Sequence, residues 1–250
     1  MNRAILMTAL VAGWISIASG EEVPKAEVIL DKYVEVTGGK AAYQKIQTQI
    51  ATGSMEFVGK GIKATLTSYK TKPRNSYSAI EIEGIGKIES GTNGEAAWER
   101  SNLQGPRIKQ GEERAAALRD AALNVDWREL FKKAETAGVE NIGDQACYKV
   151  ILTPEEGKPE TRYYDKKTNL LVKVTKIVKT PMGEIPAEVM VSGYKDINGI
   201  LIPHTLKQKG FGQELLIVLE TIRHNTDIPK DRFDLPEDVK ALLEKPKPNQ

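Results

Sequence analysis

Cysteine is almost absent from the sequence, and this scarcity limits how the fold can be stabilised. The 250 residues contain one cysteine, Cys147. A single cysteine excludes an intrachain disulfide, so the fold must be held by its hydrophobic core. Cys147 lies in a strand-like segment with no histidine or basic helix start nearby in sequence. This setting favours a buried structural side chain over a reactive thiol.

Catalytic and metal-binding patterns are also missing. The two histidines, His204 and His224, do not have metal-ligand spacing, and neither H-E-x-x-H nor G-x-S-x-G occurs. Residues 192–195, SGYK, match S-x-x-K, but a strand points residues three apart to opposite faces. The glycine-rich stretch GIGKIESG precedes no helix and indicates a bent strand. We therefore expect no enzyme, no cofactor and no metal.

A strong excess of one charge is absent too. Lys and Arg number 36, Asp and Glu number 34, and the formal net charge is +2. This balance argues against nucleic acid or an anionic membrane surface as the main partner. The lysines are spread along strand-like segments and are not interleaved with aromatics, which also disfavours a nucleic-acid platform.

The N-terminus has the order of a secretory signal peptide. MNR is basic, AILMTALVAGWISIA is apolar, and small residues precede Glu21 and Glu22. The apolar run is shorter than the ~20 residues that span a bilayer. We expect residues 1–20 to be a signal peptide cleaved after Gly20, and the mature protein to be periplasmic.

Helical and alternating patterns together predict a mainly β fold of the α+β class. Apolar residues from Ala26 to Val34 recur at helical spacing after Pro24, and Gly38-Gly39 ends this pattern. KAAYQKI indicates a short second helix. From about residue 47 to 105, and again after Gly138, apolar and polar residues alternate between glycine-containing breaks. This texture predicts a strongly curved antiparallel sheet.

A helical insert interrupts the strands at about residues 111–137. EERAAALRDAAL is rich in helix formers, and Asp126 with Glu129 forms a capping-box pattern before a second helix. A short helix is expected within FDLPEDVKALLEKPKPNQ (233–250). We expect one domain over residues 21–242, a flexible tail over 243–250, and a monomer.

Large apolar residues are the remaining positive signal. They are either ordinary core or the lining of a cavity for an apolar ligand, enclosed by a curved sheet and its helical cover. The candidates for this lining are Met55, Phe57, Leu66, Trp98, Leu118, Trp127, Phe131, Met190 and Phe211.

Four short motifs resemble the LolA family of periplasmic lipoprotein carriers, also called outer-membrane lipoprotein-sorting proteins. They are KTKPRN (70–75), NGEAAW (93–98), the hairpin YYDKKTNLL (163–171) and FDLPEDV (233–239). The order of the expected elements also agrees with the family: an N-terminal helix, strands, a helical insert, strands and a final F-x-x-P segment.

The resemblance implies an incomplete antiparallel β-barrel with a helical lid and an apolar interior that takes acyl chains of lipoproteins or free lipids. It also implies inner-membrane donor and outer-membrane acceptor proteins. In the family an arginine before the proline of the K-x-P loop holds the lid. That position is Lys72 here, and Arg74 follows Pro73, so both are candidates for a lid latch.

Other hypotheses remain open at this stage. A sensor on the same half-barrel would bind lipid-bearing molecules and signal through a partner, without catalysis. A structural or assembly protein would have a dry core and no cavity. Binding of an acyl probe separates the lipid-binding hypotheses from the structural one.

Overall fold

Helices form a small part of the chain, at its two ends and in its middle. The computed structural model describes residues 23–123, 125–181, 183–210 and 212–244. Its helical elements are α1 (Ala26–Val36), α2 (Lys40–Gln44), α3 (Gly111–Ala121), the 3-10 helices η1 (Trp127–Glu129) and η2 (Lys230–Phe233), and α4 (Glu237–Glu244). None of the helices in these ranges has the length and apolar character needed to cross a membrane.

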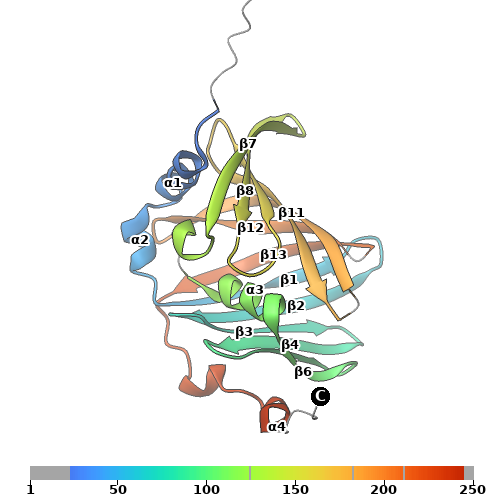
Figure 1. The fold of residues 1–250 in the computed structure, drawn as a ribbon. Helices are drawn as coiled ribbons and strands as arrows, with labels where there is room; N and C mark the ends of the chain where they lie inside the picture. The colour runs from blue at the N-terminus through green and yellow to red at the C-terminus, as the bar shows by residue number, and fades with distance from the viewer. Residues whose placement is uncertain (1–22, 124, 182, 211, 245–250) are drawn as a thin grey trace, which may run out of the picture.

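The alternating segments of the described chain form one antiparallel sheet of 13 strands (Figure 1). The strands are β1 (Thr48–Phe57), β2 (Ile62–Thr71), β3 (Asn75–Ile82), β4 (Gly86–Asn93), β5 (Ala97–Ser101), β6 (Gly105–Lys109), β7 (Lys133–Ile142), β8 (Gln145–Thr153), β9 (Glu160–Asp165), β10 (Leu171–Thr180), β11 (Gly183–Ile197), β12 (Ile200–Gly210) and β13 (Gln213–His224). The mainly β, curved and unclosed fold expected from the sequence is confirmed.

The strand order shows how the sheet is assembled. The order is β6-β5-β4-β3-β2-β1-β13-β12-β11-β10-β9-β8-β7. Every neighbouring pair except β1 and β13 is therefore consecutive in the sequence. β1 pairs with β13 antiparallel, with a bulge between Thr52 and Gly53. The sheet therefore consists of two meanders joined at β1 and β13, and β6 and β7 are its edges.

The two faces of the sheet can be separated by strand register. Lys70 on β2 and Lys176 on β10 both contact Asp120 of α3. We call the face that carries these lysines the inner face. Because side chains alternate along a strand, Met55 and Leu66 also belong to it. Figure 1 shows α3 lying across this side of the curved sheet.

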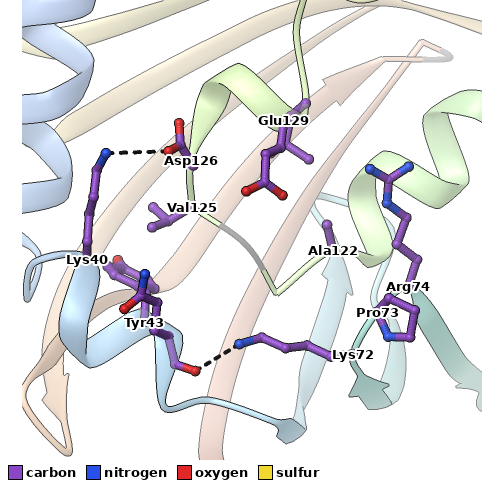
Figure 2. A pocket seen from close by; sticks show the side chains of 11 residues that line it. Lys40, Tyr43, Lys72, Pro73, Arg74, Ala122, Val125, Asp126 and Glu129 are labelled. Carbon is purple, nitrogen blue, oxygen red and sulfur yellow. Dashed lines mark hydrogen bonds and ion pairs between the residues drawn. The ribbon is translucent and has the colours of Figure 1, made fainter.

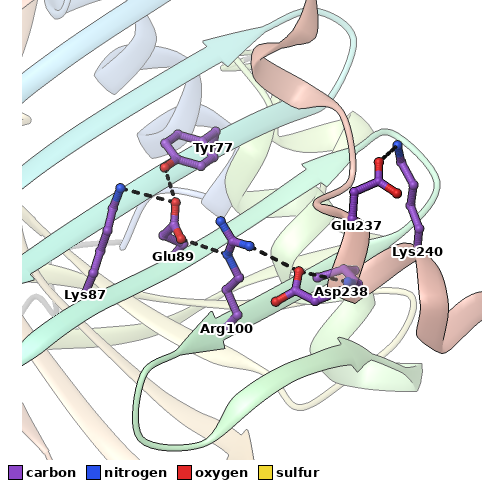
Figure 3. A network of polar contacts seen from close by, with 8 residues as sticks. Tyr77, Lys87, Glu89, Arg100, Glu237, Asp238 and Lys240 are labelled. Atoms are coloured by element: carbon purple, nitrogen blue, oxygen red, sulfur yellow. Dashed lines mark hydrogen bonds and ion pairs between the residues drawn. The ribbon is translucent and has the colours of Figure 1, made fainter.

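The opposite, outer face is covered near β3–β6 by the C-terminal segment. Arg100 on β5 joins Glu89 on β4 through Nε and Oε2 at 2.8 Å, and Asp238 on α4 through Nη1 and Oδ1 at 3.1 Å (Figure 3). The guanidinium of Arg232 in η2 lies over the rings of Tyr69 and Tyr77, 4.8 and 5.3 Å from their centroids. These polar and cation–π contacts fix η2 and α4 outside the sheet.

The N-terminal helix closes the inner face at the other end of the sheet. The buried stripe Ala26, Ile29 and Leu30 of α1 packs against Phe131 and against side chains of β8 and β9. The Tyr33 and Tyr164 rings have centroids 5.3 Å apart. This packing buries the expected apolar stripe of the first helix.

The prediction of a second helix in the insert, after Asp126, is wrong. α3 occupies 111–121, but Asp126 caps only the single turn η1, accepting a hydrogen bond from the Arg128 amide. β7 begins at Lys133 and pairs with β8. Pairing with β8 satisfies the backbone of 133–142 and outweighs local helix propensity. The expected signal peptide and residues 245–250 of the expected tail lie outside the described residues, and α4 extends to Glu244.

Candidate functional site

The inner face carries rows of mainly apolar residues that run across several strands. Paired residues share a face, so the register places the members of each row side by side. One row is Ile82, Ala64, Met55, Ile217, Leu206 and Val191; a second is Ile88, Ile80, Leu66, Gly53 and Leu219; a third is Ile62, Phe57, Leu215, Gln208, Val189 and Val174. We call these three rows the trough.

Many trough side chains remain partly accessible to water. Met55, Ala64 and Val191 are buried, but Leu66, Leu206 and Ile217 are half-buried and Ile88 is 41% exposed. Apolar side chains in the core of a protein are usually fully buried. A contiguous apolar surface that water still reaches is typical of a site that binds a ligand or a partner. The trough therefore has apolar surface left to cover.

Three polar contacts hold α3 over the inner face. The ammonium of Lys70 donates to the carbonyl oxygen of Asp120, 2.6 Å away. Lys176 lies 3.5 Å from the Asp120 carboxylate. Arg107 of β6 contacts both carboxylate oxygens of Glu113 at 2.8 Å. α3, which we call the lid from here on, is thus attached to β2, β6 and β10 by charged side chains.

The Lys70 contact uses the end of the helix. Asp120 lies in the last turn of α3, where carbonyl oxygens have no partner within the helix and carry partial negative charge. Burial lowers the pKa of Lys70, and the nearby Asp120 carboxylate partly offsets this. The hydrogen bond from Lys70 to the Asp120 carbonyl is therefore made by a partly desolvated ammonium group.

The expected latch residues do not contact α3 in this way. Lys72 donates to the carbonyl oxygen of Gln44 in α2 at 3.0 Å (Figure 2). The Arg74 side chain is exposed, and its backbone carbonyl accepts from Thr92. Both residues line a cavity of about 440 Å³ between α2, the β2–β3 turn and residues 122–130. The residue that reaches the lid is Lys70, two positions before Lys72.

Other sequence-predicted site residues divide between the two faces. Met55, Phe57 and Leu66 lie in the trough. Leu118 is on the buried side of α3, and Phe131 and Trp127 pack in the cluster around α1. Phe211 lies outside the described residues.

Trp98 and Met190 lie on the outer face and do not line the trough. Trp98 is 2% exposed, packs over Gly91 and has its ring centroid 6.3 Å from that of Tyr77. Met190 packs against the buried Cys147 and Tyr163. Both side chains point away from α3 because they are one residue out of phase with the inner-face positions on their strands. Cys147 is fully buried, and burial raises the pKa of its thiol.

Sequence reasoning missed the cations that hold the lid: Lys70, Arg107 and Lys176. A signal for Lys70 does exist, because it is four residues from Leu66 on one strand and therefore shares its face. Among the described residues, no group of three or more His, Cys, Asp or Glu side chains is placed to hold a metal ion.

Structural comparison finds the same architecture in solved proteins. A LolA superfamily protein from Nitrosomonas europaea, NE2245, matches with a TM-score of 0.57 and 14% identity over 85% of this chain and 99% of its own. A domain from Vibrio parahaemolyticus, described as a candidate outer membrane lipoprotein-sorting protein, matches with a TM-score of 0.55 and 13% identity over 86% of this chain and 100% of its own.

A DUF1329 family protein from Desulfovibrio piger also matches, with a TM-score of 0.55 and 17% identity over 84% of this chain and 97% of its own. No protein-family model and no curated protein sequence matches the chain. At these identities the likeness concerns the fold alone. The chain has a LolA-like fold, an open curved antiparallel sheet whose inner face is crossed by a helix.

Proposed function

We propose that this protein is a non-catalytic periplasmic carrier that shields acyl chains of lipoproteins or lipids in the trough. The observation that carries the proposal is the set of aligned, partly accessible apolar rows beneath α3. From β3 to β11 the first row crosses five inter-strand steps of about 4.8 Å, which gives about 24 Å of apolar surface. This length suits an extended hydrocarbon chain.

Burial of the chain supplies the binding free energy. Each methylene removed from water contributes about 0.8 kcal/mol. No catalytic group is needed for such transfer, and the charged contacts of α3 provide a cover that can detach and reattach. The donor and acceptor proteins implied by the family resemblance belong to this proposal, as does export by a cleaved signal peptide.

The proposal is tested by lipid content and by a pair of matched variants on β2. The mature protein purified from membranes is expected to carry stoichiometric lipid in native mass spectrometry. Leu66→Glu places a carboxylate in the trough and is expected to lower affinity for an uncharged fluorescent acyl probe at least about tenfold, because a buried unpaired charge is costly.

The control is Thr67→Glu, one residue along on the outer face. It is expected to leave probe affinity unchanged, and both variants should keep the circular dichroism spectrum of the parent protein. A protein that is always isolated empty and binds no acyl probe would overturn the proposal. Equal loss of binding in both variants with the fold intact would move the site away from the inner face.

A further inference from the structure

A cavity of about 330 Å³ lies at one end of the inner face, between α1, the C-terminal end of α3 and the sheet. Gln49 of β1 and Lys70 of β2 contribute to its floor, and Tyr33 of α1 and Trp127 of η1 contribute to its walls. The cavity differs from the trough because polar and charged side chains make up much of its lining.

The charge of the lining is predominantly positive. Lys70, Arg119 and Arg162 all line the cavity, and Asp120 is the carboxylate among its lining residues. Glu160 pairs with Arg162 at 2.7 Å between Oε1 and Nε. Burial opposes the charge of Arg162, but Glu160 and Tyr164 together outweigh burial and raise the pKa of Arg162, so this guanidinium stays charged.

Donors in this lining lack partners. Among the described residues, Nε of Arg119 is buried without a hydrogen bond, and the Tyr164 hydroxyl, which lies beside the Arg162 guanidinium, has no acceptor for its own proton. Tyr164 is 0% exposed, and burial raises its pKa, so the hydroxyl keeps its proton and can donate. A buried donor without an acceptor costs free energy, and such groups call for an explanation. A bound acceptor would provide one.

The cavity and the trough lie on the same face of two strands. Gln49 and Met55 lie on the same face of β1, and Lys70 and Leu66 lie on the same face of β2. Lys70 and Leu66 are four residues apart, or about 13 Å along a strand. A single amphiphile can therefore place its head in the cavity and its chain in the trough.

We propose that this cavity binds the oxyanion headgroup of an acyl lipid, a phosphate or carboxylate, whose chain lies in the trough. Arg119 Nε and the Tyr164 hydroxyl donate to its oxygens, and Lys70 uses ammonium hydrogens that Asp120 does not take. The acyl part of this inference rests on the proposed function; the preference for an anionic head does not follow from it.

Two lipids with one chain and different heads test the preference. Displacement of an uncharged fluorescent acyl probe from the delipidated mature protein is measured with oleoyl lysophosphatidic acid and with monooleoylglycerol. The anionic lipid is expected to bind at least about tenfold more tightly, because hydrogen bonds to charged groups are the strong ones. Equal affinity would overturn the inference and leave the carrier proposal intact.

Variants locate the preference in the cavity. Tyr164→Phe removes only the hydroxyl, and Arg119→Met removes the guanidinium. Each is expected to weaken the anionic lipid about tenfold and to leave monooleoylglycerol unchanged. Arg114→Met is the control on the same helix, because Arg114 is exposed and its Nε donates to the Glu95 carbonyl outside the cavity.

The remaining outcomes also decide the question. Unchanged lysophosphatidic acid affinity in both Tyr164→Phe and Arg119→Met would overturn the assignment to this cavity. If inorganic phosphate alone displaced lysophosphatidic acid at equal concentration, the headgroup of a lipid would be the wrong source of the anion. Failure of every acyl probe to bind would overturn the carrier proposal and this inference together.

Discussion

Lys70 and Lys72 are chemically identical and two residues apart, yet they serve different parts of the molecule. Lys70 lies within β2 and reaches the last turn of α3, whereas Lys72 follows the strand and reaches α2. The lowered pKa of Lys70 means that the unfolded chain holds this proton more tightly. While charged, Lys70 therefore lowers the stability of the fold as it holds the lid.

Lys70→Met is expected to loosen α3 without unfolding the sheet. Amide hydrogen exchange over residues 111–121 should accelerate, because the tie to the Asp120 carbonyl is lost. The free energy of unfolding should stay equal or rise, because a desolvated charge is removed. Lys72→Met is the matched control and should leave exchange in α3 unchanged. Faster exchange of α3 in Lys72→Met, with no change in Lys70→Met, would show that Lys72 and not Lys70 holds α3.

At single positions the sequence identifies which side chains are apolar, but it predicts less well which face of the sheet each of them occupies. Met55, Phe57 and Leu66 follow a simple alternation and share the inner face. Trp98 and Met190 have the same apolar character but lie out of phase with the inner-face positions of their own strands. A bulge or a turn that shifts alternation by one residue reverses the face, and its location depends on partners distant in sequence.

α3 is short for an isolated helix and depends on its tertiary contacts. It spans Gly111–Ala121, buries Leu118 and Ala121, and has no side-chain N-cap hydrogen bond. Helices of this length are marginal in water alone. Its attachment to β6 is the two-oxygen contact of Arg107 with Glu113, in which Arg107 also binds Glu99 at 2.7 Å.

Glu113→Gln is expected to weaken the attachment of α3 to β6 by about 1 kcal/mol, a typical value for a partly exposed charged pair. Hydrogen exchange in the first turns of α3 should accelerate about fivefold, and β1 and β13 should be unaffected. Glu112→Gln, one residue earlier on the same helix, is the control. If exchange accelerated equally in Glu112→Gln, the cause would be the loss of a negative charge at the helix N-terminus and not the loss of the contact with Arg107.

At the level of elements, strong local patterns were sufficient for α1, α2, α3, α4 and most hairpins. The exception is residues 133–137, where helix formers lie in β7. Lys133 and Ala134 pair with Thr153 and Leu152 of β8, and this pairing also continues past Gly138. Hydrogen bonds to a neighbouring strand are a tertiary feature, so a local reading of the sequence does not contain them.

The whole sheet depends on one junction between its two meanders. The paired residues of β1 and β13 lie between 158 (Phe57 and Leu215) and 175 (Gln49 and His224) positions apart in the chain, and Gly53 lies at the bulge in that pairing. A Cβ on Gly53 would come within 2.2 Å of the Val218 carbonyl oxygen. Local sequence patterns predict the separate hairpins, but not which two distant strands unite them, because that choice is made by long-range packing.

Gly53→Ala is expected to destabilise the protein by about 1–3 kcal/mol, since the backbone at the junction must move to admit the methyl group. Urea unfolding measures the loss. Gly210→Ala is the control: its Cβ would meet neighbours at 3.5 Å or more, and its stability should change by less than about 0.5 kcal/mol. If Gly53→Ala were as stable as the parent protein, β1 and β13 would be able to move apart at this junction without loss of stability.

The path of the chain from β6 to β7 has a mechanical consequence. These strands are the two edges of the sheet, and residues 110–132, which contain the lid, connect them. Because this connection is covalent, any movement that spreads β6 and β7 apart also stretches the segment that crosses the inner face. Under the proposed carrier function, the length of this connection sets an upper limit on the thickness of an acyl ligand that fits between α3 and the sheet.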